Sequence, residues 1–185
     1  HLTYVPIPKT VDEPKTKPTQ QSANMLMERG IHPDSIIARC EQNLHPNIRK
    51  KIALFAGIKP ENVISGVDLD CVYKIPAAFE EQGLREIINI KLATLFRPEM
   101  REWTTLVDKL NNLDGKITTA VCGKYTNLKD SYASIHEALT HCSAHLGVEI
   151  EKKLIDTEEI ENGSLTLEQA LEGVNSVIVP GGFGH

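Results

Sequence analysis

Short apolar runs alternate with amphipathic stretches along the first half of the chain. Residues 2–7 alternate between apolar and polar types and end in prolines, which predicts a strand that leads into a loop. Apolar residues between polar flanks predict further strands at 35–38 and from Val63 onward. Helical spacing follows each strand, at residues 19–29, 46–56, 75–82 and 84–96. Strand–helix alternation of this kind predicts an α/β fold with a parallel sheet.

The alternation is interrupted at residues 96–98 and then resumes. An amphipathic helix is predicted at 99–113, and its apolar side consists of Trp103, Leu106, Val107 and Leu110. A polar turn follows, and then strands at 117–121, 149–155 and 176–179 with helices at 129–146 and 167–171 between them. We therefore expect two α/β units, residues 1–97 and 116–185, joined by a linker helix and turn at 98–115. The second unit is too short to be a complete domain of this type.

Composition narrows the classes of partner. The chain is 41% hydrophobic and 24% charged, as in an ordinary globular protein. A net charge of −5 argues against a nucleic-acid partner, so any cationic site has to be local. No apolar run reaches membrane-spanning length and no signal-peptide pattern is present, so we expect a cytoplasmic protein without a membrane partner. The four cysteines form no CxxC pair, which favours reduced thiols over a zinc site or disulfides.

The clearest candidate for chemistry is the stretch KTKPTQQS at residues 15–22. Lys15 and Lys17 lie two residues apart, directly before a predicted helix whose first turn suits Pro18. Unpaired N–H groups at a helix start favour anions, and lysines add point charges suited to phosphate. A solvated basic loop would explain the same charges. On the residues alone, both a polyphosphate site and a solvated loop remain open.

Three charged residues follow predicted strands. Lys15, Arg39 and Asp68 each come after a strand of the first unit, and ligands of parallel α/β sheets bind beyond the carboxyl ends of strands. These side chains are therefore expected to converge on one crevice. Two alternatives stand beside this hypothesis: Arg39 could form a structural salt bridge, and Asp68 with Asp70 could bind a metal.

The last predicted strand ends in the turn PGGFG at residues 180–184. Gly181 and Gly182 can adopt backbone conformations that present bare N–H groups, and two such donors stabilise a tetrahedral oxyanion. Cys142 lies inside a predicted helix rather than at a strand-to-helix elbow, and His141 and His145 are its helix neighbours. These three are interpreted as structural or surface residues and not as a catalytic set.

Taken together, the motifs resemble those of CTP synthases, glutamine-dependent amidoligases that convert UTP to CTP. They occur in family order over essentially the whole chain, as HLTYVP at 1–6, KTKPTQ with Ser22, IALF at 52–55, DLD at 68–70, VCGKY at 121–125 and VPGGFG at 179–184. The resemblance implies the end of a P-loop-like synthetase (amidoligase) domain at 1–97. It further implies the start of a flavodoxin-like class I glutamine amidotransferase domain at 116–185. The chain is thus interpreted as the middle of a longer protein.

The resemblance also implies roles for individual residues. UTP, and CTP as product inhibitor, would be bound by Lys15, Thr16, Lys17, Pro18, Thr19, Gln20 and Lys51. For Lys51, which follows Arg49 and Lys50, a solvated helix face is the alternative. ATP would be bound by Val67, Asp68 and Leu69 at the adenine, and by Arg39. The backbone of Gly181 and Gly182 would bind glutamine or its oxyanion.

The remaining machinery of such an enzyme is expected outside this segment. The resemblance implies that the Mg²⁺ ligands and the phosphate-binding glycine loop lie upstream of His1, so no metal site is expected here. The catalytic Cys, His and Glu are expected beyond His185. The segment alone should therefore be inactive.

The resemblance implies that the protein as a whole is a ligase of pyrimidine biosynthesis. The resemblance implies that ATP phosphorylates the 4-oxygen of UTP, ammonia from glutamine completes CTP, GTP is a candidate activator, and the enzyme is a homotetramer. Two residues depart from the family pattern: Gln21 replaces a frequent histidine, and Ala133 replaces a lysine common in bacterial relatives. The alternatives are a non-catalytic module that senses UTP or CTP, and an assembly segment.

Overall fold

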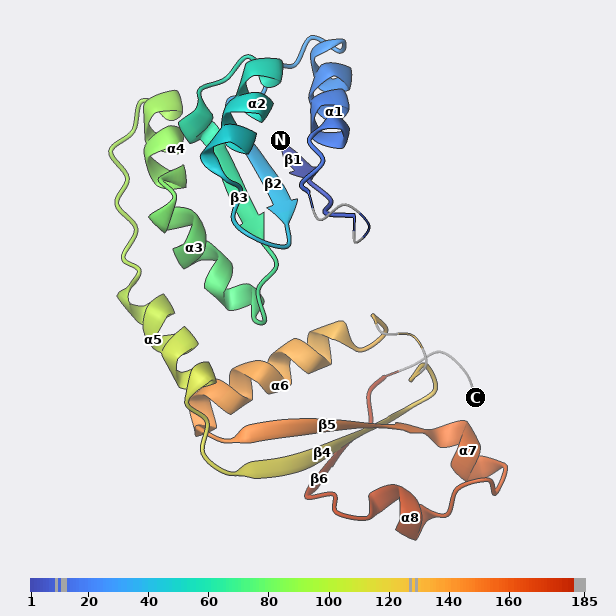
Figure 1. Ribbon diagram of the computed structural model, residues 1–185. Coiled ribbons are helices and arrows are strands. Elements are labelled where there is room, and N and C mark those ends of the chain that lie inside the picture. Colours follow the sequence, from blue (N-terminus) through green and yellow to red (C-terminus); the bar gives the residue numbers. More distant parts are fainter. Residues whose placement is uncertain (9, 11–12, 127, 129, 182–185) are drawn as a thin grey trace. The chain divides into compact units, whose positions relative to one another are not determined.

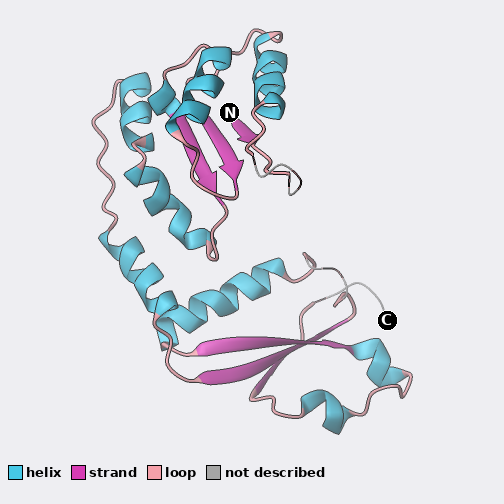
Figure 2. Cartoon of the chain, in the orientation of Figure 1, coloured by secondary structure: helices cyan, strands magenta, loops and turns pink. Residues whose placement is uncertain are grey.

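A computed structural model describes residues 1–8, 10, 13–126, 128 and 130–181. The chain divides into two compact units, His1–Met100 and Arg101–His185, and each contains its own three-stranded sheet. Every strand pairing in the two sheets is parallel, and helices connect the strands (Figures 1 and 2). The predicted α/β class with parallel sheets is confirmed. The division between the units lies inside the segment 98–115 that we assigned to a linker.

The sheet of the first unit has the order β1-β2-β3. Its strands are β1 (Leu2–Tyr4), β2 (Ile36–Cys40) and β3 (Val63–Val67). The helices are α1 (Lys17–Met27), α2 (Pro46–Ala56), α3 (Ile75–Glu81) and α4 (Leu84–Leu92), with the 3₁₀ turns η1 (Pro60–Asn62) and η2 (Val72–Lys74) before β3 and α3. Each predicted helix and strand of this unit is therefore present, with ends that differ by a few residues.

Alternation along β2 builds the core of this unit. Ile36, Ala38 and Cys40 are fully buried in one cluster with Ala23 of α1 and Ile52 of α2. The side chains between them point to the other face of the sheet, where Arg39 is exposed. One face of β2 thus packs against the helices, and the other face places the charged side chain of Arg39 near the end of the sheet.

A buried threonine joins α1 to β1. The Thr19 side chain is fully buried, and its hydroxyl donates to the Tyr4 carbonyl oxygen at 2.9 Å and lies 3.2 Å from the Thr3 hydroxyl. The helix begins at Lys17, two residues before the predicted start, with Pro18 in its first turn. The hydroxyl of Thr19 therefore fixes the start of α1 against the first strand.

The second unit contains a sheet of order β5-β4-β6. Its elements are α5 (Arg101–Asn111), β4 (Lys116–Gly123), α6 (Ala133–Leu146), β5 (Glu149–Asp156), α7 (Thr157–Glu161), α8 (Leu167–Leu171) and β6 (Ser176–Ile178). Leu139 of α6 packs with Val121 on one side of the sheet, whereas Ala170 of α8 packs with Ala120 and Ile155 on the other. None of the described helices is long and apolar enough to cross a membrane.

Two helices of this unit differ from expectation. Helix α5 packs against α6, but its predicted inward residues Trp103, Leu106, Val107 and Leu110 are only partly buried. Helix α7 was not predicted, because its sequence TEEIE has no apolar periodicity. It forms because the Asp156 carboxylate accepts a hydrogen bond from the Glu158 N–H at 3.0 Å and so caps the helix start.

Gly123, at the end of β4, lies against the ring of Tyr132. A Cβ at this position would lie 2.8 Å from the Tyr132 Cζ atom and would also overlap its hydroxyl. Tyr132 is buried, so it cannot turn out into solvent to make room. The close approach of strand and ring therefore requires glycine.

We predict that Gly123→Ala destabilises the full-length protein by about 1–3 kcal/mol, the usual cost of forcing extra atoms into a packed site. Gly181→Ala is the matched control, since a Cβ at Gly181 would meet nothing within 4 Å. Thermal and urea unfolding of both variants would measure the difference. Equal stability of the two variants would contradict the described packing of Tyr132.

Candidate functional site

An ion pair lies at the carboxyl edge of the first sheet. Arg39, on β2, donates from Nε to Oδ1 of Asp68 at 2.8 Å, and Asp68 directly follows β3. The hydrogen bond and the negative charge of Asp68 raise the pKa of Arg39. The side chains are 66% and 49% exposed, so solvent screens the pair and it adds little to stability. Both partners therefore remain accessible to a ligand.

The four residues expected to bind ATP line a single cleft of about 770 Å³. Val67, Asp68 and Leu69 form its rim at the end of β3, and Arg39 lies beside them on the neighbouring strand β2. The structure thus brings these residues together at the edge of the sheet where parallel α/β proteins bind ligands.

Sequence reasoning missed most of the rest of this cleft. Helix α3, which runs beside β3 in Figure 1, contributes apolar side chains together with the preceding η2 turn: Val72, Ile75, Ala78 and Phe79. Arg49 of α2 and Gln82 at the end of α3 add polar groups. The pattern of α3 predicts a helix, but nothing in it shows that the apolar side faces an open cleft. For Arg49 and Gln82 the sequence carried no signal.

A second cleft, of about 670 Å³, lies beside the first. Tyr4, Pro18, Ser22, Arg39 and Asp68 all line it. Arg39 and Asp68 are thus shared by both clefts, and Pro18 belongs to the KTKPTQ motif. The start of α1 and the end of β3 therefore border one continuous region. Of the three residues expected to converge, Arg39 and Asp68 line both clefts, whereas Lys15 lines neither.

Two lysines lie near one carboxylate. Lys15 Nζ lies 2.7 Å from Oε2 of Glu13. The pKa of Glu13 is lowered first by that hydrogen bond, then by the charge of Lys15, and further by the charge of Lys51. The charge of Lys51, from α2, thus acts on the same carboxylate as Lys15, with the smaller effect of the two. An incoming anion could take the position that the Glu13 carboxylate occupies.

The KTKPTQ motif at residues 15–20 contains both exposed and buried side chains. Lys17 and Pro18 are exposed at the first turn of α1, whereas Thr16 and Thr19 are buried. The Thr16 hydroxyl accepts a hydrogen bond from the Gln20 amide nitrogen at 2.9 Å. The side chains of both threonines therefore stabilise the start of α1, whereas the lysine side chains carry the positive charge of the motif.

Asp68 and Asp70 are both engaged by cationic side chains. Asp70 accepts hydrogen bonds from Lys74 Nζ at 2.9 and 3.0 Å, which lowers the pKa of Asp70, while Asp68 is held by Arg39. Across the described residues no group of three or more His, Cys, Asp or Glu side chains could hold a metal ion.

The turn at the end of β6 is only partly described. Gly181 is exposed, whereas Gly182, Phe183 and Gly184 of the PGGFG motif lie outside the described residues. Near the ends of β4 and β5, Lys124 forms a 3.2 Å ion pair with Glu158, which raises the pKa of Lys124. Lys124 is thus already paired with a carboxylate.

The cysteine and histidine side chains of α6 differ in exposure from the thiol of Cys40. Cys142, His141 and His145 are exposed on α6. Cys40 lies in the core, and burial, with a smaller effect of the Asp68 charge, raises its pKa to about 11. A thiol with this pKa is protonated near neutral pH, so Cys40 is not an activated nucleophile.

Comparison with known proteins identifies relatives along the whole chain. A family model described as "CTP synthase N-terminus" matches residues 1–94. The chain is 45% identical over 188 residues to a CTP synthase of Borreliella burgdorferi, 43% over 185 residues to one of Thermococcus gammatolerans, and 42% over 185 residues to one of Methanopyrus kandleri. Each match covers 100% of this chain and 34–35% of the relative. The chain therefore spans about a third of the length of these curated relatives.

Proposed function

The chain belongs to the CTP synthase family, and we propose that the protein containing it makes CTP from UTP, with ATP and glutamine as co-substrates. This is a ligase reaction of pyrimidine biosynthesis. The observation that carries the proposal is the shared position of Arg39 and Asp68. They border both the cleft beside α3 and the cleft that reaches the lysine-rich start of α1. Two nucleotides bound there would lie next to each other.

We assign UTP, and CTP as product, to the start of α1. A triphosphate carries about four negative charges and therefore needs several cations. Lys15, Lys17 and Lys51 supply them, and the first turn of α1 adds unpaired N–H groups. Thr16, Thr19 and Gln20 shape that turn through their internal hydrogen bonds, and Pro18 borders the adjacent cleft.

We assign ATP to the cleft beside α3. Its apolar side suits a flat purine ring, and the backbone of Val67, Asp68 and Leu69 offers hydrogen-bond partners to the ring edge. The Arg39 guanidinium, exposed at the edge of the sheet, is suited to bind a phosphate oxygen. In this reaction the γ-phosphoryl group moves from ATP to the 4-oxygen of UTP and ADP is left. Ammonia then attacks carbon 4 of the uracil ring and displaces phosphate.

The remaining parts of the reaction depend on residues outside this chain. A Mg²⁺ ion would neutralise the phosphates, but Asp68 and Asp70 are paired with cations, so we assign its ligands upstream of His1. In the second unit, Gly181 and Gly182 would donate N–H groups to the oxyanion formed during glutamine hydrolysis. We further propose that the nucleophile of glutamine hydrolysis lies beyond His185 and that GTP activates the enzyme. We also propose that the enzyme is a homotetramer located in the cytoplasm.

Two neighbouring lysines test the UTP assignment. We predict that Lys51→Ala in the full-length protein weakens UTP binding by roughly ten- to hundred-fold, because a charge-assisted hydrogen bond contributes about 1.5–3 kcal/mol. Lys50→Ala is the matched control, since Lys50 is an exposed lysine on the same helix. Isothermal titration with UTP and ATP would give both affinities. Equal loss in both variants, or equal loss of ATP and UTP, would mean that Lys51 does not bind UTP.

The nitrogen donor tests the glutaminase assignment. We predict that Gly182→Pro slows CTP formation from glutamine by about a hundred- to a thousand-fold, because proline removes the N–H donor. CTP formation from free ammonia should continue in the same preparation, since ammonia bypasses glutamine hydrolysis. Loss of both activities in a folded protein would place this turn in the synthetase reaction.

Binding of UTP without CTP formation by the unmodified protein would favour a nucleotide sensor.

A further inference from the structure

The outer edge of β3 is bonded by a side chain. Among the described residues β3 pairs with β2 alone, so its other edge has no neighbouring strand. On that edge the Ser65 N–H donates to Oε1 of Gln82 at 2.8 Å, and Nε2 of Gln82 donates to the Ser65 carbonyl oxygen at 2.9 Å. The amide of Gln82 therefore makes the same two bonds that a residue of a neighbouring strand would make.

All four hydrogen-bonding positions of the Gln82 amide are occupied. Besides its bonds to Ser65, Nε2 donates to the Ala78 carbonyl oxygen at 3.1 Å, and Oε1 accepts from Nη2 of Arg49 at 2.8 Å. Two carbonyl acceptors surround the nitrogen and two donors surround the oxygen, which fixes the orientation of the amide. Replacing it by a carboxylate would bring an oxygen against two carbonyl oxygens.

These bonds join three elements at one point. Gln82 ends α3, Ser65 is in the middle of β3, and Arg49 comes from α2. Arg49 also donates from Nη2 to the Ser65 hydroxyl at 3.1 Å. Ser65 is buried, so unsatisfied backbone groups at this point would be costly. The amide therefore fixes how far α3 lies from β3.

The distance between α3 and β3 sets the width of the ATP cleft. Gln82 itself lines this cleft, together with Ile75 and Phe79 of α3 and the rim residues Val67–Leu69 at the end of β3. Ser65 lies two residues before Val67, so a shift of its backbone is passed to the rim. We propose that Gln82 is a positioning residue for ATP: it holds the apolar side of α3 at the distance from the Val67–Leu69 rim that accepts the purine. This inference rests on the proposed function.

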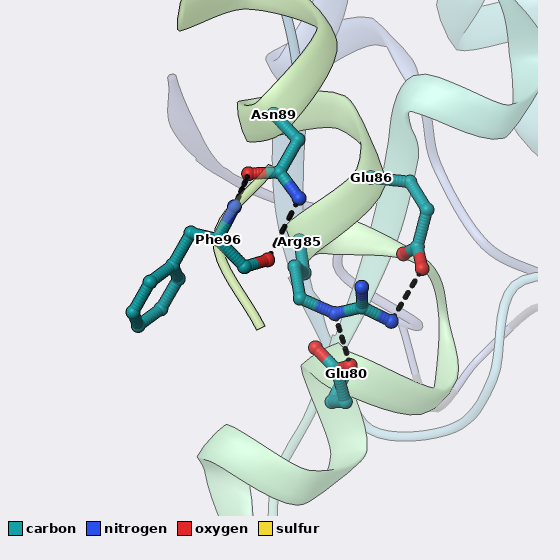
Figure 3. A network of polar contacts seen from close by, with 5 residues as sticks. All are labelled: Glu80, Arg85, Glu86, Asn89 and Phe96. Atoms are coloured by element: carbon teal, nitrogen blue, oxygen red, sulfur yellow. Dashed lines mark hydrogen bonds and ion pairs between the residues drawn. The ribbon is translucent and has the colours of Figure 1, made fainter. Parts of the chain in front are cut away.

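The chain offers a matched control for this role. Asn89 of α4 bonds the backbone of Phe96 in a similar way, since Nδ2 donates to the Phe96 carbonyl oxygen at 2.9 Å and Oδ1 accepts from its N–H at 3.1 Å (Figure 3). Asn89 does not line the ATP cleft. Asn89→Asp and Gln82→Glu both convert a backbone-bonding amide to a carboxylate, but only Gln82→Glu changes the support of the cleft.

The test is steady-state kinetics of the full-length protein with ATP and UTP varied in turn. Gln82→Glu should raise the KM for ATP by roughly ten- to hundred-fold, with the KM for UTP changed by less than about twofold. Asn89→Asp should change neither value beyond about twofold. If Gln82→Glu does not fold, Gln82→Asn keeps a neutral amide that is one methylene too short, and it should raise the KM for ATP in the same direction.

Several outcomes would overturn the inference. A folded Gln82→Glu or Gln82→Asn variant with an unchanged KM for ATP would do so, as would an equal rise of the KM for ATP in Asn89→Asp. Asp68→Ala separates this failure from a failure of the proposed function. If Asp68→Ala raises the KM for ATP and the Gln82 variants do not, the inference alone is wrong. If Asp68→Ala has no effect either, the ATP assignment is wrong and the inference fails with it.

Discussion

The parallel register between β2 and β3 is the constraint on which the first unit depends. It pairs Arg39 with Gly66 and Cys40 with Val67, and the Asp68 N–H continues it by donating to the Cys40 carbonyl oxygen at 3.0 Å. Because side chains alternate along a strand, this register buries Cys40 and leaves Arg39 free to reach Asp68. A slip by one residue would turn Arg39 into the apolar core. The same alternation thus builds the core and forms the ion pair between the clefts.

The sequence predicts much of this arrangement, because it depends on local patterns. Strand–helix alternation indicates parallel strands, and parallel strands place the residues that follow them at one edge. Arg39 and Asp68 are therefore expected to lie close together from the pattern alone, and the pair is observed at 2.8 Å. Lys51 required the family resemblance, because a run of three basic residues on a helix is typical of a solvated face. In the structure its charge contributes, after Lys15, to lowering the pKa of Glu13.

Features that depend on contacts between distant residues could not be predicted. Gln82 bonds Ser65 across 17 positions, and no periodicity marks a glutamine at a helix end as the partner of a strand edge. The hydrogen bond from the Thr19 hydroxyl to the Tyr4 carbonyl oxygen of β1 could not be predicted either, since the motif that contains Thr19 indicated a nucleotide contact. The UTP and ATP roles of these residues stay predictions, as does the oxyanion role of Gly181 and Gly182, the latter lying outside the described residues.

The central claim is that the cleft between β3 and α3 binds the adenine nucleotide and that the lysines at the start of α1 bind a different one. Photo-crosslinking of the full-length protein with 8-azido-ATP, followed by mass spectrometry of its peptides, tests this most directly. We expect labelled residues between Ser65 and Gln82, with labelling suppressed by excess ATP and unaffected by excess UTP. Absence of label from this part of the chain, or equal suppression by UTP, would contradict the claim.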